Sequence, residues 1–249
     1  PLDADVLAAA RKLRVISRVG VGLDSVDLNA ARAEGIVVRN TPDAVTNPVA
    51  ELTLSGIVNV LRHVSLMDRE LRGGDWNRRM GRMLTGRTVG IIGLGRIGRR
   101  LSTLLAPFDV KLLASERAPD HAVAKRLGVT FVTLEELLAE ADVVTLHLPG
   151  GSRPILGADQ LALMKPDAVL VNTSRGGLVD EHALHAALSE GRLAGAYVDT
   201  FEDEPYEGPL RDLPNVLLTP HAGSFTAEAR LQMEMEAVEN MLAALEEFR

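Results

Sequence analysis

The stretch from Thr88 to Gly98 reads TVGIIGLGRIG, an apolar run of strand length that ends in the pattern G-x-G-x-x-G. Gly93 permits a tight turn, Gly95 lets the backbone approach a pyrophosphate closely, and Gly98 lets a helix and a strand pack together. A helical pattern of apolar residues begins at Ile97, so free N–H groups and the positive end of a helix dipole face the turn. The stretch therefore predicts the phosphate-binding corner of a dinucleotide site.

The next apolar run, residues 110–114, is followed by Glu116. A carboxylate at this distance from the glycine turn can accept hydrogen bonds from an adenosine ribose. It also repels a 2′-phosphate, so Glu116 predicts NAD rather than NADP, while the neighbouring Arg117 weakens that preference. The alternative interpretation is a strand-helix-strand corner that binds nothing.

The composition is that of an acidic chain without cysteine. Of the 249 residues 46% are hydrophobic, which is ample for a large core, and the net charge of −7 argues against a nucleic-acid surface. The lack of cysteine excludes disulfides, thiolate metal sites and cysteine nucleophiles, and it fits a cytoplasmic enzyme. No stretch reaches the roughly 18 uncharged apolar residues of a membrane span, and we recognise no signal peptide. We therefore expect neither nucleic acid nor membrane as a partner.

From Thr88 onward, apolar runs of strand length alternate with helical patterns. The run at residues 168–171 is unbroken, as a strand buried on both faces of a parallel sheet requires. The alternation predicts an α/β domain with a doubly wound parallel sheet, of the Rossmann type. The expected strands are residues 88–92, 110–114, 129–132, 142–148, 168–172, 194–199 and 216–219, and the expected helices lie near residues 96–106, 120–127, 133–140, 158–165 and 180–190.

The remaining parts of the chain hold fewer elements. We expect helices at residues 4–12, 27–34, 48–72 and from 226 to the end, and strands at residues 13–19 and 36–39. Two strands in the first forty or so residues are few for a separate domain, and the chain enters at a helix. We therefore expect that a preceding part of this domain is missing.

Charged side chains follow the expected strands at their carboxyl ends, where open α/β sheets bind ligands. Arg175, the acidic run Glu202–Glu204 and His221 each come shortly after one of the last three strands. An arginine can bind a carboxylate bidentately and polarise the neighbouring oxygen, and a histidine can move the hydroxyl proton as hydride leaves. A nearby carboxylate stabilises the imidazolium and orients its ring. The set suits hydride transfer to or from a carbonyl beside a carboxylate.

The same residues also have structural interpretations. Arg175 stands beside two glycines and could hold a loop, and His221 follows a proline in a turn and could be a surface residue. Spacing alone does not choose which acid of the run Glu202–Glu204 pairs with His221. Asp199 ends a strand, and it either serves the cofactor or caps a turn. His147 lies in a strand and could be buried.

Other chemistries find little support in the sequence. His182 and His185 have the wrong spacing for a two-ligand helix face, and no third ligand is evident, so we expect no metal. The pattern G-x-S-x-G is absent, which argues against serine hydrolysis.

Six motifs occur in a fixed order along nearly the whole chain. They are Arg18–Asp24 (RVGVGLD), Asn40–Pro42 (NTP), Val49–Glu51 (VAE), Gly93–Gly98 (GLGRIG), Asn172–Gly177 (NTSRGG), and Glu204-Pro205 followed by Pro220-His221. With them the chain resembles the D-isomer-specific 2-hydroxyacid dehydrogenase family. The resemblance implies an NAD-dependent oxidoreductase that acts on a small 2-hydroxy or 2-oxo acid.

The resemblance also implies a role for individual residues. The catalytic arginine, glutamate and histidine fall at Arg175, Glu204 and His221, and the backbone of Gly20, Val21 and Gly22 faces the substrate carboxylate together with Arg175. The residues implied to bind the cofactor are Gly93, Gly95, Arg96, Ile97, Gly98, Glu116, Leu148, Pro149, Thr173, Ser174, Asp199 and Gly223.

For the domains, the resemblance implies a truncated flavodoxin-like substrate domain and a complete nucleotide-binding domain. The first comprises residues 1–45, completed by the C-terminal helix 226–249, and the second comprises residues 46–225. Helix 48–72 resembles the dimerisation arm of the family, which implies a homodimer through the nucleotide-binding domains. We expect Trp76, the only tryptophan, to be buried in that interface.

Within the family, residues 199–210 and 220–240 are most similar to D-3-phosphoglycerate dehydrogenases. This similarity implies oxidation of D-3-phosphoglycerate to 3-phosphohydroxypyruvate, a step of serine biosynthesis. The alternatives are a glyoxylate or hydroxypyruvate reductase of the same family, and a non-catalytic NAD-sensing binding protein. A formate dehydrogenase is a weaker alternative, because formate oxidation needs no proton transfer by an acid-paired histidine.

Overall fold

A computed structural model describes residues 1–248, which divide into two compact units. Residues 49–223 form the larger unit, and residues 1–48 form the smaller unit together with residues 224–248. Within residues 1–248, no helix combines the length and the apolar character needed to cross a membrane.

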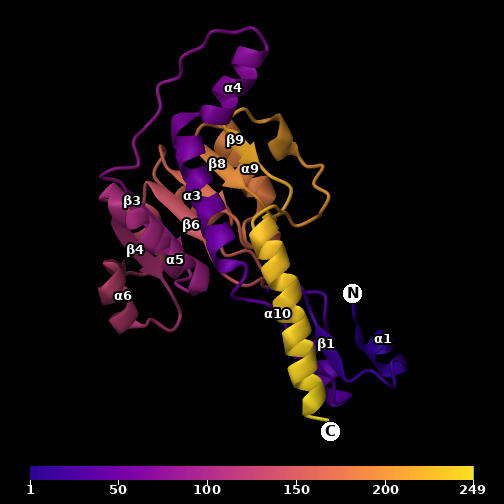
Figure 1. Ribbon diagram of the computed structural model, residues 1–249. Helices are drawn as coiled ribbons and strands as arrows, with labels where there is room; N and C mark the ends of the chain where they lie inside the picture. Colours follow the sequence, from indigo (N-terminus) through magenta and orange to yellow (C-terminus); the bar gives the residue numbers. More distant parts are fainter. Residues whose placement is uncertain (249) are drawn as a thin grey trace. The chain divides into compact units, whose positions relative to one another are not determined.

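The larger unit of residues 49–223 contains a seven-stranded sheet in the order β5-β4-β3-β6-β7-β8-β9, with every pairing parallel (Figure 1). The order reverses between β3 and β6, which makes the sheet doubly wound and confirms the predicted Rossmann-type fold. The strands are β3 (Thr88–Ile92), β4 (Lys111–Ser115), β5 (Val129–Phe131), β6 (Val143–Leu146), β7 (Val169–Asn172), β8 (Gly195–Val198) and β9 (Val216–Leu218).

Successive residues of a strand point to opposite faces of the sheet, so both faces carry apolar side chains. Helices cover both of these faces. Val89 and Ile91 of β3 pack in one apolar cluster and Ile92 packs in the other. The first cluster includes side chains of α3 (Thr46–Arg62), α5 (Arg96–Leu105) and α6 (His121–Leu127), and the second those of α7 (Leu134–Glu140), α8 (Ala158–Ala162) and α9 (Glu181–Ser189). The short 3-10 helices are η1 (Ala106–Phe108), η2 (Gly176–Leu178) and η3 (Pro209–Asp212).

The predicted single helix over residues 48–72 is wrong, because the structure divides it into α3 and α4 (Val64–Arg72). The break lies at His63, whose backbone is left-handed with φ 55°. The Asn59 side chain holds the break, since its Oδ1 accepts from Ser65 N at 3.0 Å and its Nδ2 donates to Ser65 Oγ at 2.7 Å. An N–H near the start of α4 thereby gains a partner that the interrupted helix cannot supply.

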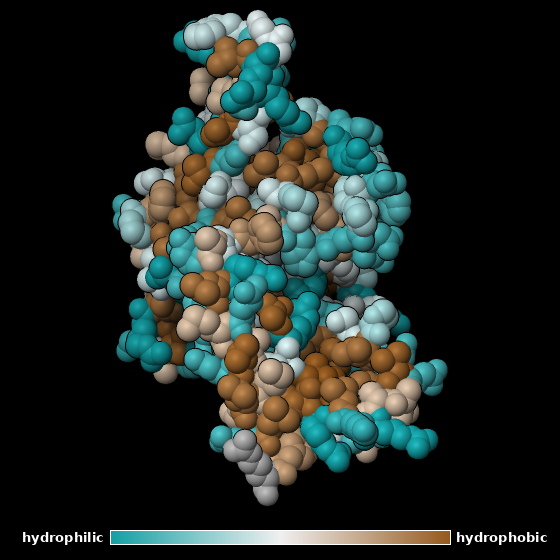
Figure 2. Space-filling model, turned by 45° about the vertical axis from the view of Figure 1, so that its right-hand side comes forward, coloured by the Kyte–Doolittle hydropathy of each residue, from teal (hydrophilic) through white to brown (hydrophobic). Residues whose placement is uncertain are grey.

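The smaller unit contains a parallel pair, β1 (Val15–Ser17) and β2 (Val37–Arg39), with α1 (Ala4–Ala9), α2 (Leu28–Ala33) and α10 (Ala227–Glu246). Its core includes Leu7, Ala31 and Ile36. Ser17 Oγ donates to the carbonyl of Ala237 at 2.6 Å, which ties β1 to α10. Other apolar side chains of α10 are exposed, among them Leu231, Met235, Val238, Leu242 and Leu245. Apolar side chains gather near the C-terminal end of the chain in the space-filling view (Figure 2).

Asp142, directly before β6, accepts a backbone hydrogen bond from β3 and forms an ion pair with Lys165. Its Oδ2 accepts from Thr88 N at 2.8 Å, and its Oδ1 lies 3.1 Å from Lys165 Nζ. Burial by itself would raise the pKa of Asp142, but the Thr88 N–H and the Lys165 ammonium outweigh it, so the pKa lies below its usual value.

We expect Asp142→Asn to lower the free energy of unfolding by about 1–3 kcal/mol at pH 7, because the amide leaves Lys165 without its charged partner. Because the folded-state pKa of Asp142 is depressed, its contribution is present above the unfolded-state pKa and is lost as the pH falls through the folded value. Urea unfolding should therefore show a difference between wild type and variant that shrinks between pH 7 and about pH 3.

Glu140→Gln serves as the control, because it removes an ion pair to Lys111 whose two side chains are about half exposed. We expect it to change the free energy of unfolding by less than about 0.5 kcal/mol. An Asp142→Asn defect of equal size at pH 7 and pH 3 would contradict the assigned role of the carboxylate.

Candidate active site

The glycine turn after β3 combines tight packing with open space. Gly93 has φ +96°, and a Cβ there would lie 2.5 Å from the carbonyl oxygen of His147. A Cβ on Gly98 would lie 2.5 Å from the carbonyl oxygen of Gly93, so α5 packs directly against the turn. A Cβ on Gly95 would meet no atom within 4 Å, and Gly95 caps α5 without a side-chain hydrogen bond. Open space therefore lies at a helix N-terminus, as an anionic pyrophosphate requires.

Glu116 follows β4 and is tied to the same turn. Its Oε2 accepts from Leu94 N at 3.0 Å, and its Oε1 accepts from Arg117 N at 3.0 Å. A carboxylate has about four lone-pair sites, so these two bonds leave acceptor capacity for the hydroxyls of a ribose. The open space at Gly95 and the carboxylate of Glu116 together fit a dinucleotide.

His147 closes the other side of the turn, at the end of β6. Its Nε2 lies 3.1 Å from Thr145 Oγ1, and its Nδ1 is buried with no hydrogen-bond partner among residues 1–248. Burial lowers the pKa of His147 to about 3, so the ring is neutral at physiological pH. His147, which the sequence placed in a strand without assigning it a role, therefore adds no charge beside the glycine turn.

The other residues predicted to bind the cofactor lie at the same carboxyl edge of the sheet. Arg96 and Ile97 open α5, Leu148 and Pro149 follow β6, and Thr173 and Ser174 follow β7. Thr173 and Ser174 are buried, and the hydroxyls of Thr173 and Thr53 lie 2.8 Å apart. Their contact with a cofactor stays a prediction.

Arg175 projects from a loop that other residues hold in place. Its Nη1 donates to the carbonyl of Ser174 at 2.7 Å, and its own carbonyl accepts from Asn172 Nδ2 at 2.8 Å. A Cβ on Gly176 would lie 1.8 Å from the carbonyl carbon of Phe201, so this loop touches the loop that follows β8. The guanidinium is therefore presented by a fixed backbone.

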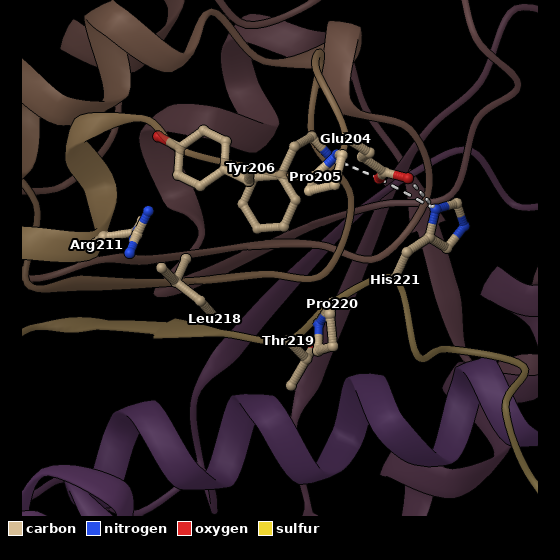
Figure 3. Close-up of a pocket in the computed structure, with 9 residues that line it drawn as sticks. Glu204, Pro205, Tyr206, Arg211, Leu218, Thr219, Pro220 and His221 are labelled. Atoms are coloured by element: carbon tan, nitrogen blue, oxygen red, sulfur yellow. Dashed lines mark hydrogen bonds and ion pairs between the residues drawn. The ribbon is translucent and has the colours of Figure 1, made fainter.

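The structure brings Glu204 and His221 together. His221 Nδ1 lies 2.9 Å from Oε2 and 3.1 Å from Oε1 of Glu204 (Figure 3). Glu204 Oε1 also accepts from Phe201 N at 3.0 Å. A carboxylate only accepts, so in this pair Nδ1 carries a proton and Nε2 is the nitrogen left for a substrate. Spacing left three acids open as partners, and the contact of His221 Nδ1 with the Glu204 carboxylate selects Glu204.

A pocket of about 600 Å³ adjoins this pair in the larger unit. Its lining is mainly apolar and includes Phe201, Tyr206 and Leu218. Figure 3 shows Glu204 and His221 at one end of the view and Arg211 at the other.

Asp199 binds the loop that carries His221. Its carboxylate accepts from Ala222 N at 2.8 Å and Gly223 N at 2.9 Å, and its carbonyl accepts from His221 N at 2.8 Å. Thr219 Oγ1 also donates to Asp199 Oδ1. The sequence predicted Asp199 and Gly223 as cofactor residues, and this stays a prediction. Sequence reasoning missed Thr219, whose only signal was a hydroxyl two positions before the histidine.

Apart from Arg175, the residues predicted to meet the substrate carboxylate lie in the smaller unit. Gly20 has φ +126°, and its N–H donates to Thr41 Oγ1 at 2.7 Å. Asn40 Nδ2 donates to the carbonyl of Val21 at 2.7 Å. The sequence Gly20–Gly22 is therefore held by the residues that follow β2, and its role toward a substrate stays a prediction. Among residues 1–248, no group of three or more His, Asp or Glu side chains could hold a metal ion.

A doubly wound sheet with a glycine turn and a carboxylate-paired histidine at one edge defines a dinucleotide-dependent oxidoreductase. Residues 54–223 match the family described as D-isomer specific 2-hydroxyacid dehydrogenase, NAD binding domain. The chain belongs to this family, whose members are NAD-dependent oxidoreductases that act on CH–OH groups. The resemblance inferred from the motifs is therefore confirmed.

Individual relatives carry two different names. The glyoxylate reductase of Aeropyrum pernix is 40% identical over 97% of this chain and 76% of its own length. The D-3-phosphoglycerate dehydrogenase of Methanocaldococcus jannaschii is 43% identical over 91% of this chain, which spans only 44% of that relative. A crystal structure of a glyoxylate reductase from Paecilomyes thermophila matches with TM-score 0.94 at 34% identity, over 99% of this chain and 76% of that one.

Two alanine variants of the glycine turn separate an effect on NADH binding from an effect on folding. Gly95→Ala places a methyl group in open space at an ordinary φ of −75°, so we expect unchanged thermal stability but an NADH dissociation constant raised at least about tenfold. Gly98→Ala drives its Cβ into the Gly93 carbonyl, so it should lower both stability and NADH affinity. NADH titration and thermal unfolding measure the two effects, and wild-type NADH affinity in Gly95→Ala would refute the pyrophosphate position.

Proposed function

We propose that the protein uses NAD to interconvert a D-2-hydroxy acid and its 2-oxo acid, with Arg175, Glu204 and His221 as the catalytic residues. The observation that carries the proposal is the contact of His221 Nδ1 with both oxygens of Glu204, at the edge of the sheet that also holds the glycine turn. Bound NAD would supply the hydride acceptor or donor for the carbon that bears the reacting oxygen. Gly93, Gly95, Gly98 and Glu116 would hold its pyrophosphate and adenosine ribose.

The side chains supply binding and proton transfer. Arg175 binds the substrate carboxylate and polarises the reacting oxygen. His221 Nε2 takes the hydroxyl proton during oxidation and returns a proton to the oxygen during reduction. Glu204 keeps Nδ1 protonated, directs Nε2 away from itself and stabilises the imidazolium.

Two substrates are supported by the relatives. D-3-phosphoglycerate, oxidised to 3-phosphohydroxypyruvate in serine biosynthesis, is supported by the Methanocaldococcus jannaschii relative. Glyoxylate is supported by the Aeropyrum pernix relative, of which this chain spans a larger share. Hydroxypyruvate is a further alternative of the same chemical class. Steady-state kinetics with all three 2-oxo acids, each with NADH and NADPH, will rank them. NADH binding without turnover of any 2-oxo acid would contradict the proposal and favour an NAD-sensing role.

We expect His221→Ala to lower kcat roughly 10²–10⁴-fold, the range typical for loss of a general acid-base. His182→Ala on the exposed face of α9 is the control and should retain wild-type kcat. Near-normal turnover of His221→Ala would reject the role of the imidazole.

Glu204→Gln should act differently from His221→Ala, because it leaves the ring in place and removes the charge that stabilises its protonated form. We therefore expect Glu204→Gln to lower kcat for reduction, by a smaller factor than His221→Ala, with KM for the 2-oxo acid near the wild-type value. Steady-state kinetics measure both constants, and wild-type kcat in Glu204→Gln would contradict the proposed pairing.

We also propose a homodimer through α4 and the segment that follows it. This part extends away from the sheet of its own unit (Figure 1), and it exposes Val64, Leu71, Trp76, Met80 and Met83. Trp76 is 82% exposed and Met80 is 94% exposed, values that a second copy of the chain would reduce. The dimerisation arm implied by the family resemblance falls on the same residues.

Leu71→Asp should convert the dimer to a monomer and shift the emission of Trp76 to longer wavelength, because a buried carboxylate costs several kcal/mol. Leu163→Asp changes a leucine of comparable exposure elsewhere in the larger unit and should leave the dimer intact. Size-exclusion chromatography with light scattering measures the mass, and a monomeric wild type would refute the interface.

A further inference from the structure

His221 has an unusual backbone conformation for a residue with a side chain. Its φ of 51° is left-handed, and only His63 and Asp109 share this feature among the non-glycine residues of the described chain. Such a conformation is strained and persists where the surroundings hold it. Asp199 supplies that hold, because its carbonyl accepts from His221 N and its carboxylate accepts from the next two N–H groups.

A series of hydrogen-bonded hydroxyl groups extends from Asp199 into the core. Thr219 Oγ1 donates to Asp199 Oδ1, and the hydroxyl of Tyr197 lies 2.9 Å from Thr219 Oγ1. A threonine hydroxyl has one proton, and Thr219 uses it on the carboxylate, so Tyr197 must be the donor to Thr219. The direction is therefore from Tyr197 through Thr219 to Asp199, and each bond polarises the next.

Tyr197 is the first hydroxyl of this series, and packing on its neighbours holds its side chain in place. It is fully buried in β8, opposite Leu217 of β9, and its ring packs on α3 at Gly56. A Cβ on Gly56 would lie 1.9 Å from the Cδ1 of Tyr197, so the helix has no side chain where the ring lies. Burial raises the pKa of Tyr197, and the phenol therefore remains a donor throughout the neutral pH range.

We propose that Tyr197 is a positioning residue for His221, acting through Thr219 and Asp199 on the loop that holds the imidazole against Glu204. This inference rests on the proposed role of His221 in proton transfer. The hydroxyl of Tyr197 orients Thr219, and the oriented Thr219 fixes the carboxylate that binds Ala222 N and Gly223 N. Tyr197 itself touches no reacting atom.

Tyr197→Phe tests the proposal, because it removes one oxygen atom and keeps the ring against Gly56. We expect kcat to fall about 2- to 12-fold, the range that corresponds to one net hydrogen bond, with KM and the NADH dissociation constant within twofold of wild type. A merely structural hydroxyl would lower the melting temperature and leave kcat unchanged.

Ser189→Ala is the control, because it also removes one hydroxyl from the larger unit, at the end of α9 and outside the loop of His221. Ser189 Oγ donates to the carbonyl of Ala186 at 3.2 Å. We expect wild-type kcat and KM for this variant. An equal loss of kcat in Ser189→Ala and Tyr197→Phe would overturn the specific role of Tyr197.

A double-mutant cycle with Thr219 tests the route. Thr219→Val removes the intermediate hydroxyl, so adding Tyr197→Phe to it should lower kcat no further, whereas Thr219→Ser should restore the effect of Tyr197→Phe. A full additional loss in the Thr219→Val background would overturn the route. The two hypotheses fail differently: near-normal turnover of His221→Ala defeats the proposed function, whereas a strong His221→Ala defect with wild-type kinetics in Tyr197→Phe defeats this inference alone.

Discussion

Parallel pairing of every strand in the larger unit is the constraint on which the candidate site depends. Because all strands run in one direction, the residues that follow them meet at a single edge of the sheet. The glycine turn after β3, Arg175 after β7, Asp199 after β8 and His221 after β9 therefore share that edge, although long segments separate them in sequence. One reversed strand would carry its loop to the opposite edge and dismantle the set.

Backbone contacts then join neighbouring loops at this edge in pairs. The Gly93 turn approaches the carbonyl of His147, and Gly176 lies against the backbone of Phe201, in both cases closer than any side chain would allow. The loops after β3 and β6, and those after β7 and β8, thus touch backbone to backbone. A side chain at either glycine would force the neighbouring loop to move, so main-chain packing limits how these loops can be arranged.

The sequence predicted the features of the fold that depend on local patterns, namely the positions of the strands and of the glycine turn. The glycine turn and the alternating apolar runs give the strands to within about two residues, because periodicity and turn chemistry act over short distances. The break at His63 could not be predicted, since no proline or glycine marks it and it depends on the Asn59 amide reaching Ser65. Likewise, the pairing of Glu204 with His221 needs two loops from different strands, so spacing alone left three acids open.

The hydrogen bonds at Asp199 explain why a carboxylate, rather than an amide, occupies this buried position. Three donors converge on its side chain, two at Oδ1 and one at Oδ2. Both side-chain atoms must therefore accept, and an asparagine would turn its NH₂ group against an N–H or a hydroxyl proton. A buried carboxylate is expensive to desolvate, and here the three donors offset that cost. The buried charge is thus tied to the backbone geometry of His221, because the N–H groups that stabilise it belong to the residues that follow this histidine.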